Sequence, residues 1–383
     1  MGELGVFPPW VVTSEAELKE VVQEIKNSPQ LAVDIESDSF YAYRERVCLI
    51  QISSPTKDYI IDPLPIQDMS CLGAIFENPA SEKIFHAGEY DVLCLKRDYQ
   101  FKFKNLFDTM IAARFLGEKE LGLKAAISKY FQIELCKKHQ RADWGKRPLS
   151  DEQLRYAQLD THFLIALSDI QKKSLSERGR LEDAKEAAEH LGLLQAQTRP
   201  FDAEGYRKIK GNRDLTPENR GILKELYLCR EEIARTRNKA RFRIMNDELL
   251  LELAKARPTE VAQLSQIKGM TPYLIQAFGR HIIDCVVRGE KSPEELFCST
   301  EKSHTRRTPP EEINLFEKMR SWRKAQGEAE HLDPAAILST EQLRDIAQAL
   351  LSKRKDIFRS LSPLKKKRYE QSLLKFISSL QMI

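Results

Sequence analysis

The sequence lacks the features of secreted, membrane-spanning and zinc-binding proteins. No apolar run reaches 18 residues, and the N-terminus has no charged segment followed by an apolar core, so neither a membrane span nor a secretory signal is predicted. The seven cysteines are odd in number and include no Cys-x-x-Cys pair, which disfavours a disulfide scaffold and a zinc site. We therefore expect a protein of the reducing cytoplasm with no membrane partner.

Length and charge divide the chain into two halves with different properties. The 383 residues, 42% of them hydrophobic, are enough for two or three domains with their own cores. Residues 1–200 carry 26 Lys and Arg against 31 Asp and Glu, whereas residues 201–383 carry 35 against 26. The basic second half is the better candidate for contact with a phosphate backbone, with solvated helix faces as the alternative.

Four carboxylates and one tyrosine form the most informative pattern. Asp34 and Glu36 lie two apart in a strand-like apolar run, so both side chains point to one face. Tyr156 and Asp160 are four apart in a stretch with helical apolar spacing, and so share a helix face. Asp91 follows a strand-like segment and a glycine turn, at the start of a short predicted helix. Three elements can therefore bring four carboxylates to one place.

This residue set suits phosphodiester hydrolysis. Hard divalent cations prefer oxygen ligands, and two of them can flank the attacking and leaving oxygens of a phosphoryl transfer. A phenol, with an ordinary pKa of about 10, is a poor base near pH 7 but a good hydrogen-bond partner for a water, so we assign Tyr156 to positioning. Each motif alone usually marks solvated or capping side chains, and only the ordered set predicts a nuclease.

The ordered set resembles the DEDD superfamily of 3′-5′ exonucleases, and within it the ribonuclease D family. The family's Asp-x-Glu motif corresponds to Asp34 and Glu36, its second motif to Asp91, and its Tyr-x-x-x-Asp motif to Tyr156 and Asp160. An arginine stands where the sister subclass has a histidine, which favours the tyrosine subclass. The resemblance implies that the four acids hold two divalent ions, Mg²⁺ or Mn²⁺, and that the tyrosine orients the nucleophile.

The resemblance also implies a substrate and a product. It indicates a monomeric exoribonuclease that trims the 3′ ends of structured RNAs, tRNA precursors among them, and releases 5′-nucleotides. One alternative is a DNA-directed 3′-5′ exonuclease, because metal chemistry does not depend on the 2′-hydroxyl. The other is an RNA-binding protein with a vestigial site, which the presence of all five residues disfavours.

Further substrate contacts are hypotheses with structural alternatives. His86 can contact substrate or make a structural hydrogen bond. Trp144 can stack on a terminal base or pack in a core, and the same choice applies to Phe40, Tyr41 and Tyr43 just after the first motif.

The second half contains an internal repeat with an offset of 93 residues and no gaps. Arg230 falls on Arg323, Leu250 on Leu343 and Ala254 on Ala347, in segments with apolar residues at helical spacing. Each copy is predicted to be a small helical bundle, and the first resembles the HRDC domain. The second departs from it near residues 361–364, which lack the glycine of the first copy.

Three basic clusters are candidates for guiding a nucleic acid. They are Arg235, Arg237, Lys239, Arg241 and Arg243 in the first bundle; Lys353, Arg354, Lys355, Lys365, Lys366, Lys367 and Arg368 in the second; and Lys137, Lys138, Arg141, Lys146 and Arg147 before the third motif.

We therefore predict an α/β exonuclease domain with a ribonuclease-H-like mixed sheet, followed by two all-α HRDC-type bundles. The domains are expected at residues 1–196, 210–290 and 308–383, with linkers near 196–213 and 291–310. Strands are expected at 31–35, 47–52, 58–61 and 83–86. The mixed character of the sheet rests on the resemblance.

Overall fold

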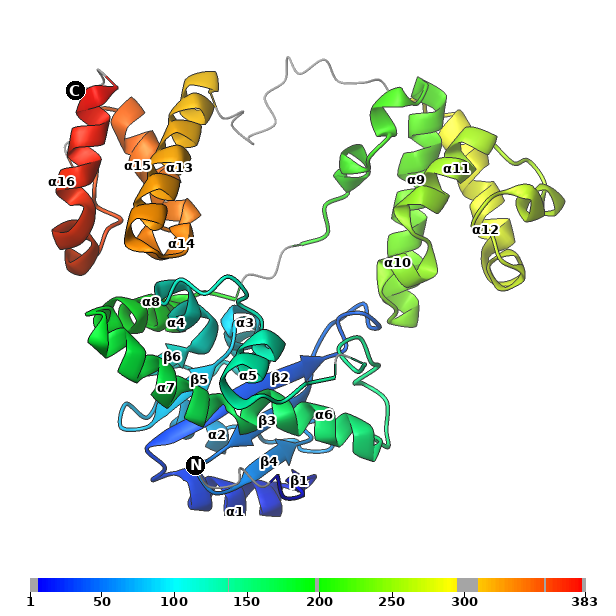
Figure 1. The fold of residues 1–383 in the computed structure, drawn as a ribbon. Helices are drawn as coiled ribbons and strands as arrows, with labels where there is room; N and C mark the ends of the chain where they lie inside the picture. The colour runs from blue at the N-terminus through cyan, green and yellow to red at the C-terminus, as the bar shows by residue number, and fades with distance from the viewer. Residues whose placement is uncertain (1–5, 137, 197–199, 295–308, 355, 381–383) are drawn as a thin grey trace. The chain divides into compact units, whose positions relative to one another are not determined.

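The computed structural model describes residues 6–136, 138–196, 200–294, 309–354 and 356–380 (Figure 1). These residues divide into two compact units. One unit spans Met1–Glu36, Val47–Ala196 and Arg307–Ile383, and the other spans Ser37–Arg46 and Gln197–Arg306. The segment 37–46 therefore groups with later helices and not with the strands that flank it in sequence. Among the described residues, no helix has both the length and the apolar character needed to cross a membrane.

The first unit contains a six-stranded mixed sheet in the order β1-β4-β3-β2-β5-β6. β1 is parallel to β4, and β5 is parallel to both β2 and β6, whereas β3 and β4 are antiparallel. The strands are β1 (Trp10–Val12), β2 (Gln30–Ser37), β3 (Val47–Ser53), β4 (Asp58–Ile61), β5 (Glu82–Phe85) and β6 (Leu106–Asp108). The mixed sheet and its four predicted strands are confirmed. The sequence analysis missed β1 and β6, because three residues are too few to show an alternating pattern.

Side-chain alternation along β2 assigns its two faces. Leu31, Val33 and Ile35 join a core with α1–α3, whereas Ala32 joins a core with α4, α5 and α7. The helices of this unit are α1 (Glu15–Ile25), α2 (Cys71–Glu77), α3 (Glu89–Tyr99), α4 (Thr109–Phe115), α5 (Leu123–Phe131), α6 (Asp151–His162), α7 (Leu164–Glu177), α8 (Leu181–Leu193), α13 (Pro310–Glu330), α14 (Pro334–Ile337), α15 (Thr340–Leu351) and α16 (Pro363–Ser379). By the same alternation, residues 34 and 36 lie on the Ala32 face.

The second unit is a helical bundle, and the predicted repeat appears in its geometry. Its helices are η1 (Gly205–Lys208), η2 (Asn212–Asp214), α9 (Pro217–Arg237), α10 (Arg241–Ile244), α11 (Asp247–Ala256), η3 (Val261–Gln266) and α12 (Pro272–Glu290). The helices α13, α14 and α15 begin 93 residues after α9, α10 and α11. Arg230 Nη1 donates to the carbonyl of Met245 at 3.0 Å, and Arg323 Nη1 donates to Leu338 at 2.9 Å. The repeated arginine thus makes an equivalent bond in both copies.

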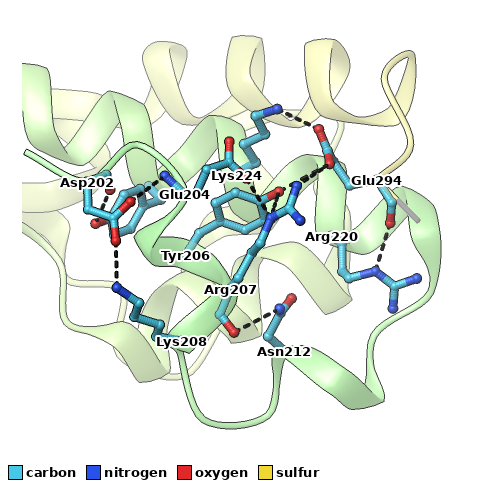
Figure 2. Close-up of polar contacts among 10 residues, drawn as sticks. Asp202, Glu204, Tyr206, Arg207, Lys208, Asn212, Arg220, Lys224 and Glu294 are labelled. Carbon is cyan, nitrogen blue, oxygen red and sulfur yellow. Dashed lines mark hydrogen bonds and ion pairs between the residues drawn. The ribbon is translucent and has the colours of Figure 1, made fainter. Parts of the chain in front are cut away.

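The segment before α9 is part of the bundle, although the sequence analysis interpreted it as a linker. Tyr206 is buried, and its hydroxyl donates to Glu294 at 3.1 Å (Figure 2). Lys224 Nζ lies 2.5 Å from the same carboxylate, and Arg220 Nε donates to the Glu294 carbonyl at 2.7 Å. Glu294 therefore joins the segment before α9 to the end of the bundle. A single buried aromatic residue gives no periodic pattern, which explains the missed contact.

We predict that Glu294→Gln loosens this junction. The substitution removes a charge that Lys224 faces and weakens the acceptor for Tyr206, at a cost of about 1–3 kcal/mol. Hydrogen exchange of amides 202–212 should accelerate accordingly. The matched control is Glu204→Gln, which removes a more exposed carboxylate paired with Arg207 at 2.6 Å and should cost less than about 1 kcal/mol. Equal acceleration in both variants would contradict this account.

Candidate functional site

The structure brings the four predicted acids into one cluster. Asp34 and Glu36 come from β2, Asp91 from the first turn of α3 and Asp160 from α6. The pKa of Glu36 is raised to about 10, first by burial and then by the charges of Asp34, Asp160 and Asp91. The four acids therefore lie near enough to one another for their charges to interact, and Asp34 and Asp91 are in hydrogen-bond contact. We call these four residues the acidic cluster.

The remaining pKa shifts have the same origin. Burial raises the pKa of Asp34 to about 7, although a hydrogen bond with the Asp91 side chain opposes the shift. The pKa of Asp91 and that of Asp160 are both raised well above the ordinary range by burial and by the Asp34 charge. The pKa of Tyr156 is raised by burial and then by Asp160, Glu36 and Asp34. Because the Asp34 and Asp91 carboxyl groups share a hydrogen bond, one of the two carries a proton in the absence of a cation.

A glycine and an aspartate fix the helix that carries Asp91. Gly88 caps α3, and a Cβ at this position would lie 2.5 Å from the Phe85 Cβ, so only glycine fits. The Gly88 amide donates to Asp108 Oδ2 at 2.8 Å, while Asp108 Oδ1 caps α4 through two amides at 2.9 Å. The sequence analysis assigned Asp108 no role. Its place before an apolar helix, typical of an N-cap residue, could have identified it.

Helix α6 is held by its buried side rather than by Tyr156 and Asp160. Gln158 and His162 both contact Asp58 Oδ2 at 2.7 Å, which ties α6 to β4. The helix ends at His162, and Phe163 separates it from α7. The helical apolar spacing around Tyr156 and Asp160 continues past His162, because two adjacent helices share it. The anchoring leaves the Tyr156 face of α6 available to the site.

Trp144 is a core residue in this structure. It is only 1% exposed and packs near Tyr156, with ring centres 6.0 Å apart. Arg147 fixes its loop by donating to the Trp144 carbonyl at 2.7 Å, to Asp62 at 2.7 Å and to the Cys48 carbonyl at 2.8 Å. A ring with no exposed face cannot stack on a base, so the stacking hypothesis for Trp144 is not supported. Its burial instead fixes one wall behind Tyr156.

A cavity of about 830 Å³ opens beside Tyr156 and Asp160. His86, Lys124 and Lys129 are among its lining residues. A second cavity of about 320 Å³ is also lined by Tyr156 and Asp160 and includes His139 and Arg155. The tyrosine and one acid of the cluster therefore line both cavities, each of which has a size that suits a nucleotide-sized ligand.

The other predicted substrate residues have defined surroundings. His86 Nδ1 lies 2.8 Å from the Thr109 hydroxyl, which donates to the Phe85 carbonyl at 3.1 Å, and burial lowers the His86 pKa. The threonine must accept from the ring, so His86 is a neutral imidazole held in place. Phe40 is 45% exposed, and the Arg243 guanidinium lies 3.7 Å from the Tyr41 ring centre. A substrate contact by His86, Phe40 or Tyr41 stays a prediction.

Many residues of the basic clusters are engaged within the protein. Lys138 pairs with Glu152 at 2.7 Å, and Arg368 with Asp183 at 2.6 Å. Lys365 is buried and donates to a glutamine at 3.0 Å. Lys137 and Lys355 lie outside the described residues. The charge runs therefore overstate the positive surface available to a phosphate backbone, because sequence alone does not reveal which charges are paired.

The donor set of the acidic cluster fits divalent ions. In the described part of the chain, no three His, Cys, Asp or Glu side chains form a ready cage for one ion. Magnesium is typically bound through one or two carboxylates and completes its shell with water and phosphate oxygens, so a cage is not required. Four adjoining acids whose pKa values are raised mainly by burial and mutual repulsion are an environment that a cation would stabilise.

Comparison with known proteins assigns both kinds of domain. Residues 9–176 match the 3′-5′ exonuclease family, and residues 219–286 and 312–380 match the HRDC domain. The chain is 28% identical to ribonuclease D of Pseudomonas paraeruginosa, over 89% of this chain and 88% of that protein. It is 31% identical to the exosome complex exonuclease RRP6 of Saccharomyces cerevisiae, over 70% of this chain but only 39% of that protein. The crystal structure of the catalytic core of RRP6 from Trypanosoma brucei has a TM-score of 0.68 at 28% identity, over 76% of this chain and 84% of that chain.

We predict that Asp91→Asn stabilises the metal-free protein at alkaline pH. An acid whose folded pKa is raised holds its proton when the unfolded chain has released it, so stability falls as pH rises from about 4 through the folded pKa. Asparagine keeps the shape and removes the charge. In the presence of a chelator at pH 8, the variant should therefore show a Tm several degrees above wild type, about 2–4 °C per kcal/mol.

Asp62→Asn is the matched control for this test. Asp62 and Asp91 are both 7% exposed, but Asp62 is paired with Arg147. Its substitution should lower the Tm, because the arginine loses its partner. A lower Tm for Asp91→Asn at pH 8 would show that repulsion does not dominate the acidic cluster.

Proposed function

Because the chain belongs to the DEDD 3′-5′ exonucleases and carries HRDC domains as ribonuclease D does, we propose that it removes nucleotides from RNA 3′ ends. The domain division proposed is 1–196, 210–290 and 308–383, with the segment around Tyr206 and Glu294 added to the first bundle. The observation that carries the proposal is the convergence of four acids from three elements, Asp91 buried and the others partly buried, beside Tyr156 and a cavity. DEDD exonucleases depend on divalent metal, and here Asp34, Glu36, Asp91 and Asp160 would hold two ions, Mg²⁺ or Mn²⁺. Bound ions supply Lewis acidity and lower the pKa of water.

The protein's own residues perform the remaining tasks. Tyr156 keeps its proton, because burial and neighbouring acids raise its pKa, so its hydroxyl donates a hydrogen bond and does not act as a base. It would orient the attacking water or a phosphate oxygen. His86, fixed by Thr109 at the cavity edge, offers a neutral ring to the terminal nucleotide. The buried Trp144 and the anchored α6 limit movement of Tyr156.

The substrate is proposed to be structured RNA, including tRNA precursors, handled by a monomer in the cytoplasm. Two relatives are named as a ribonuclease and as an exosome exonuclease, which supports RNA. The competing substrate is single-stranded DNA. End-labelled RNA and DNA strands of one sequence, each with a free or a blocked 3′ end, would decide between them in Mg²⁺ or Mn²⁺. Mononucleotide release from unblocked RNA alone is the expected result, and equal release from DNA would favour the alternative.

We predict that Asp34→Ala, Asp91→Ala and Asp160→Ala each abolish cleavage while leaving RNA binding largely intact. Losing a ligand removes the metal chemistry, whereas most affinity for RNA comes from contacts with its backbone. Cleavage is followed by gel electrophoresis and binding by fluorescence anisotropy at several salt concentrations. Retained turnover in all three variants would rule out the two-metal assignment.

Tyr156→Phe tests positioning against proton transfer. The ring and its contact with Trp144 remain, and only the hydroxyl is lost. We expect kcat to fall by about 10²-fold with little change in KM, as for loss of an orienting hydrogen bond. The pH dependence of kcat should keep its shape, because the phenol is not the titrating base. A lost ionisation in the pH profile would instead assign Tyr156 as the base.

A further inference from the structure

The ten residues that follow Glu36 form a closed loop. Segment 37–46 leaves β2 directly after the acidic pair and groups with the second unit. Its ends are joined by Asp38, which is 4% exposed and accepts from the Arg46 amide at 2.9 Å. The Asp38 amide donates back to the Arg46 carbonyl at 3.3 Å. This reciprocal pairing makes the segment a compact loop whose ends are held together.

The loop is bound to the first helical bundle by main-chain and side-chain contacts. The Ala240 amide donates to the Tyr41 carbonyl at 2.9 Å, and the Arg44 amide donates to Asn238 Oδ1 at 3.1 Å. The guanidinium of Arg243 covers the Tyr41 ring at 3.7 Å from its centre. Because the Tyr41 carbonyl and the Arg44 amide belong to the loop backbone, these bonds fix the position of the loop on the bundle independently of the loop's side chains.

Glu231 is the centre of the side-chain contacts. It is 8% exposed, accepts from the Tyr43 hydroxyl, and accepts from Arg241 Nη2 at 3.0 Å. Burial alone would raise the Glu231 pKa, but the bonds from Arg241 and Tyr43 lower it, so the carboxylate is charged. The Arg241 guanidinium also lies 5.0 Å from the Tyr43 ring centre. We call Tyr43, Glu231 and Arg241 the loop clamp.

The internal repeat shows that the clamp is not required by the bundle's fold. At an offset of 93, Glu231 corresponds to Lys324 and Arg241 to Pro334, neither of which can form such a cluster. Arg230, in contrast, has an equivalent bond in the second copy. The frame of the bundle is thus built without the clamp, which appears only in the copy that holds the loop.

We propose that the first bundle positions the catalytic strand through this loop, with Tyr43, Glu231 and Arg241 as positioning residues. β2 ends at Ser37, so the backbone of Glu36 continues into the clamped loop without an intervening flexible residue. Fixing the loop limits the conformations open to Glu36, and small displacements of a catalytic group have large effects on rate. This inference rests on the proposed nuclease function. None of the three residues belongs to the acidic cluster.

The test uses the full chain with Tyr43→Phe, Glu231→Gln and the double variant. Glu225→Gln is the matched control, because it breaks another Glu–Arg pair of this bundle, Glu225 with Arg288 at 2.8 Å. Two measurements are made: kcat and KM on a short single-stranded RNA, and Mn²⁺ affinity without RNA by calorimetry. We expect Glu231→Gln to lower kcat about tenfold and to weaken Mn²⁺ binding, with KM within about twofold. The double variant should be no worse than Glu231→Gln, because both changes act on one cluster.

Each outcome has a defined meaning. Unchanged kcat and Mn²⁺ affinity in an active protein would overturn the positioning role, as would a raised KM alone, which would assign the loop to substrate binding. An effect of equal size in Glu225→Gln would overturn it too, because general destabilisation would then explain the loss. An inactive wild type would overturn the proposed function, and the Mn²⁺ titration would still test the clamp. Tyr43→Phe removes only one hydroxyl and should leave the fold intact, so it tests the positioning role even if Glu231→Gln unfolds.

Discussion

The site depends on four carboxylates, one buried and three partly buried, that interact with one another without a basic side chain among the causes of their raised pKa values. Such a cluster is unfavourable alone, and structure elsewhere must maintain it. Two surrounding networks do so. Asp108 fixes the helix of Asp91 through Gly88, and Asp58 fixes the helix of Asp160 through Gln158 and His162. Neutral or fully paired groups directly behind the four acids therefore hold them in place. A bound cation would reduce the repulsion between the acids.

The residues of the acidic cluster and Tyr156 could be singled out from sequence because they combine fixed spacing with local geometry. Two residues apart on a strand, or four apart on a helix, share a face whatever the tertiary structure is. Asp58 could not, because it shows no periodic pattern and its partner His162 lies 104 residues away. Asp108 has the position of an N-cap residue, but its bond to Gly88, 20 residues earlier, is not visible in the sequence. Trp144 shows the same limit. An aromatic residue near a motif has the same sequence appearance whether it is buried or exposed.

Charge and linkers were the least predictable features. Whether Arg368 meets Asp183 or solvent depends on tertiary contacts, and the basic run around it gives no indication. The segment around Tyr206 looked like a linker because one aromatic residue among turn-forming residues has no period, yet that residue is buried in the bundle. The repeat, by contrast, could be predicted from the sequence. Its helices begin at matching positions in the two copies, so the two sequences align without gaps.

The duplicated arginine bond has a consequence for how the two bundles diverged. Arg230 and Arg323 make the same bond in both copies, whereas the residues on the outer surfaces of the two copies differ. Residues of the second copy, such as Met319 and Ile337, now belong to one apolar cluster with Ile84 of the sheet. A shortened protein ending after the first bundle would thus lose the second copy's share of this apolar cluster, and an attempt to reduce the protein to its first two domains should begin by replacing that missing apolar surface.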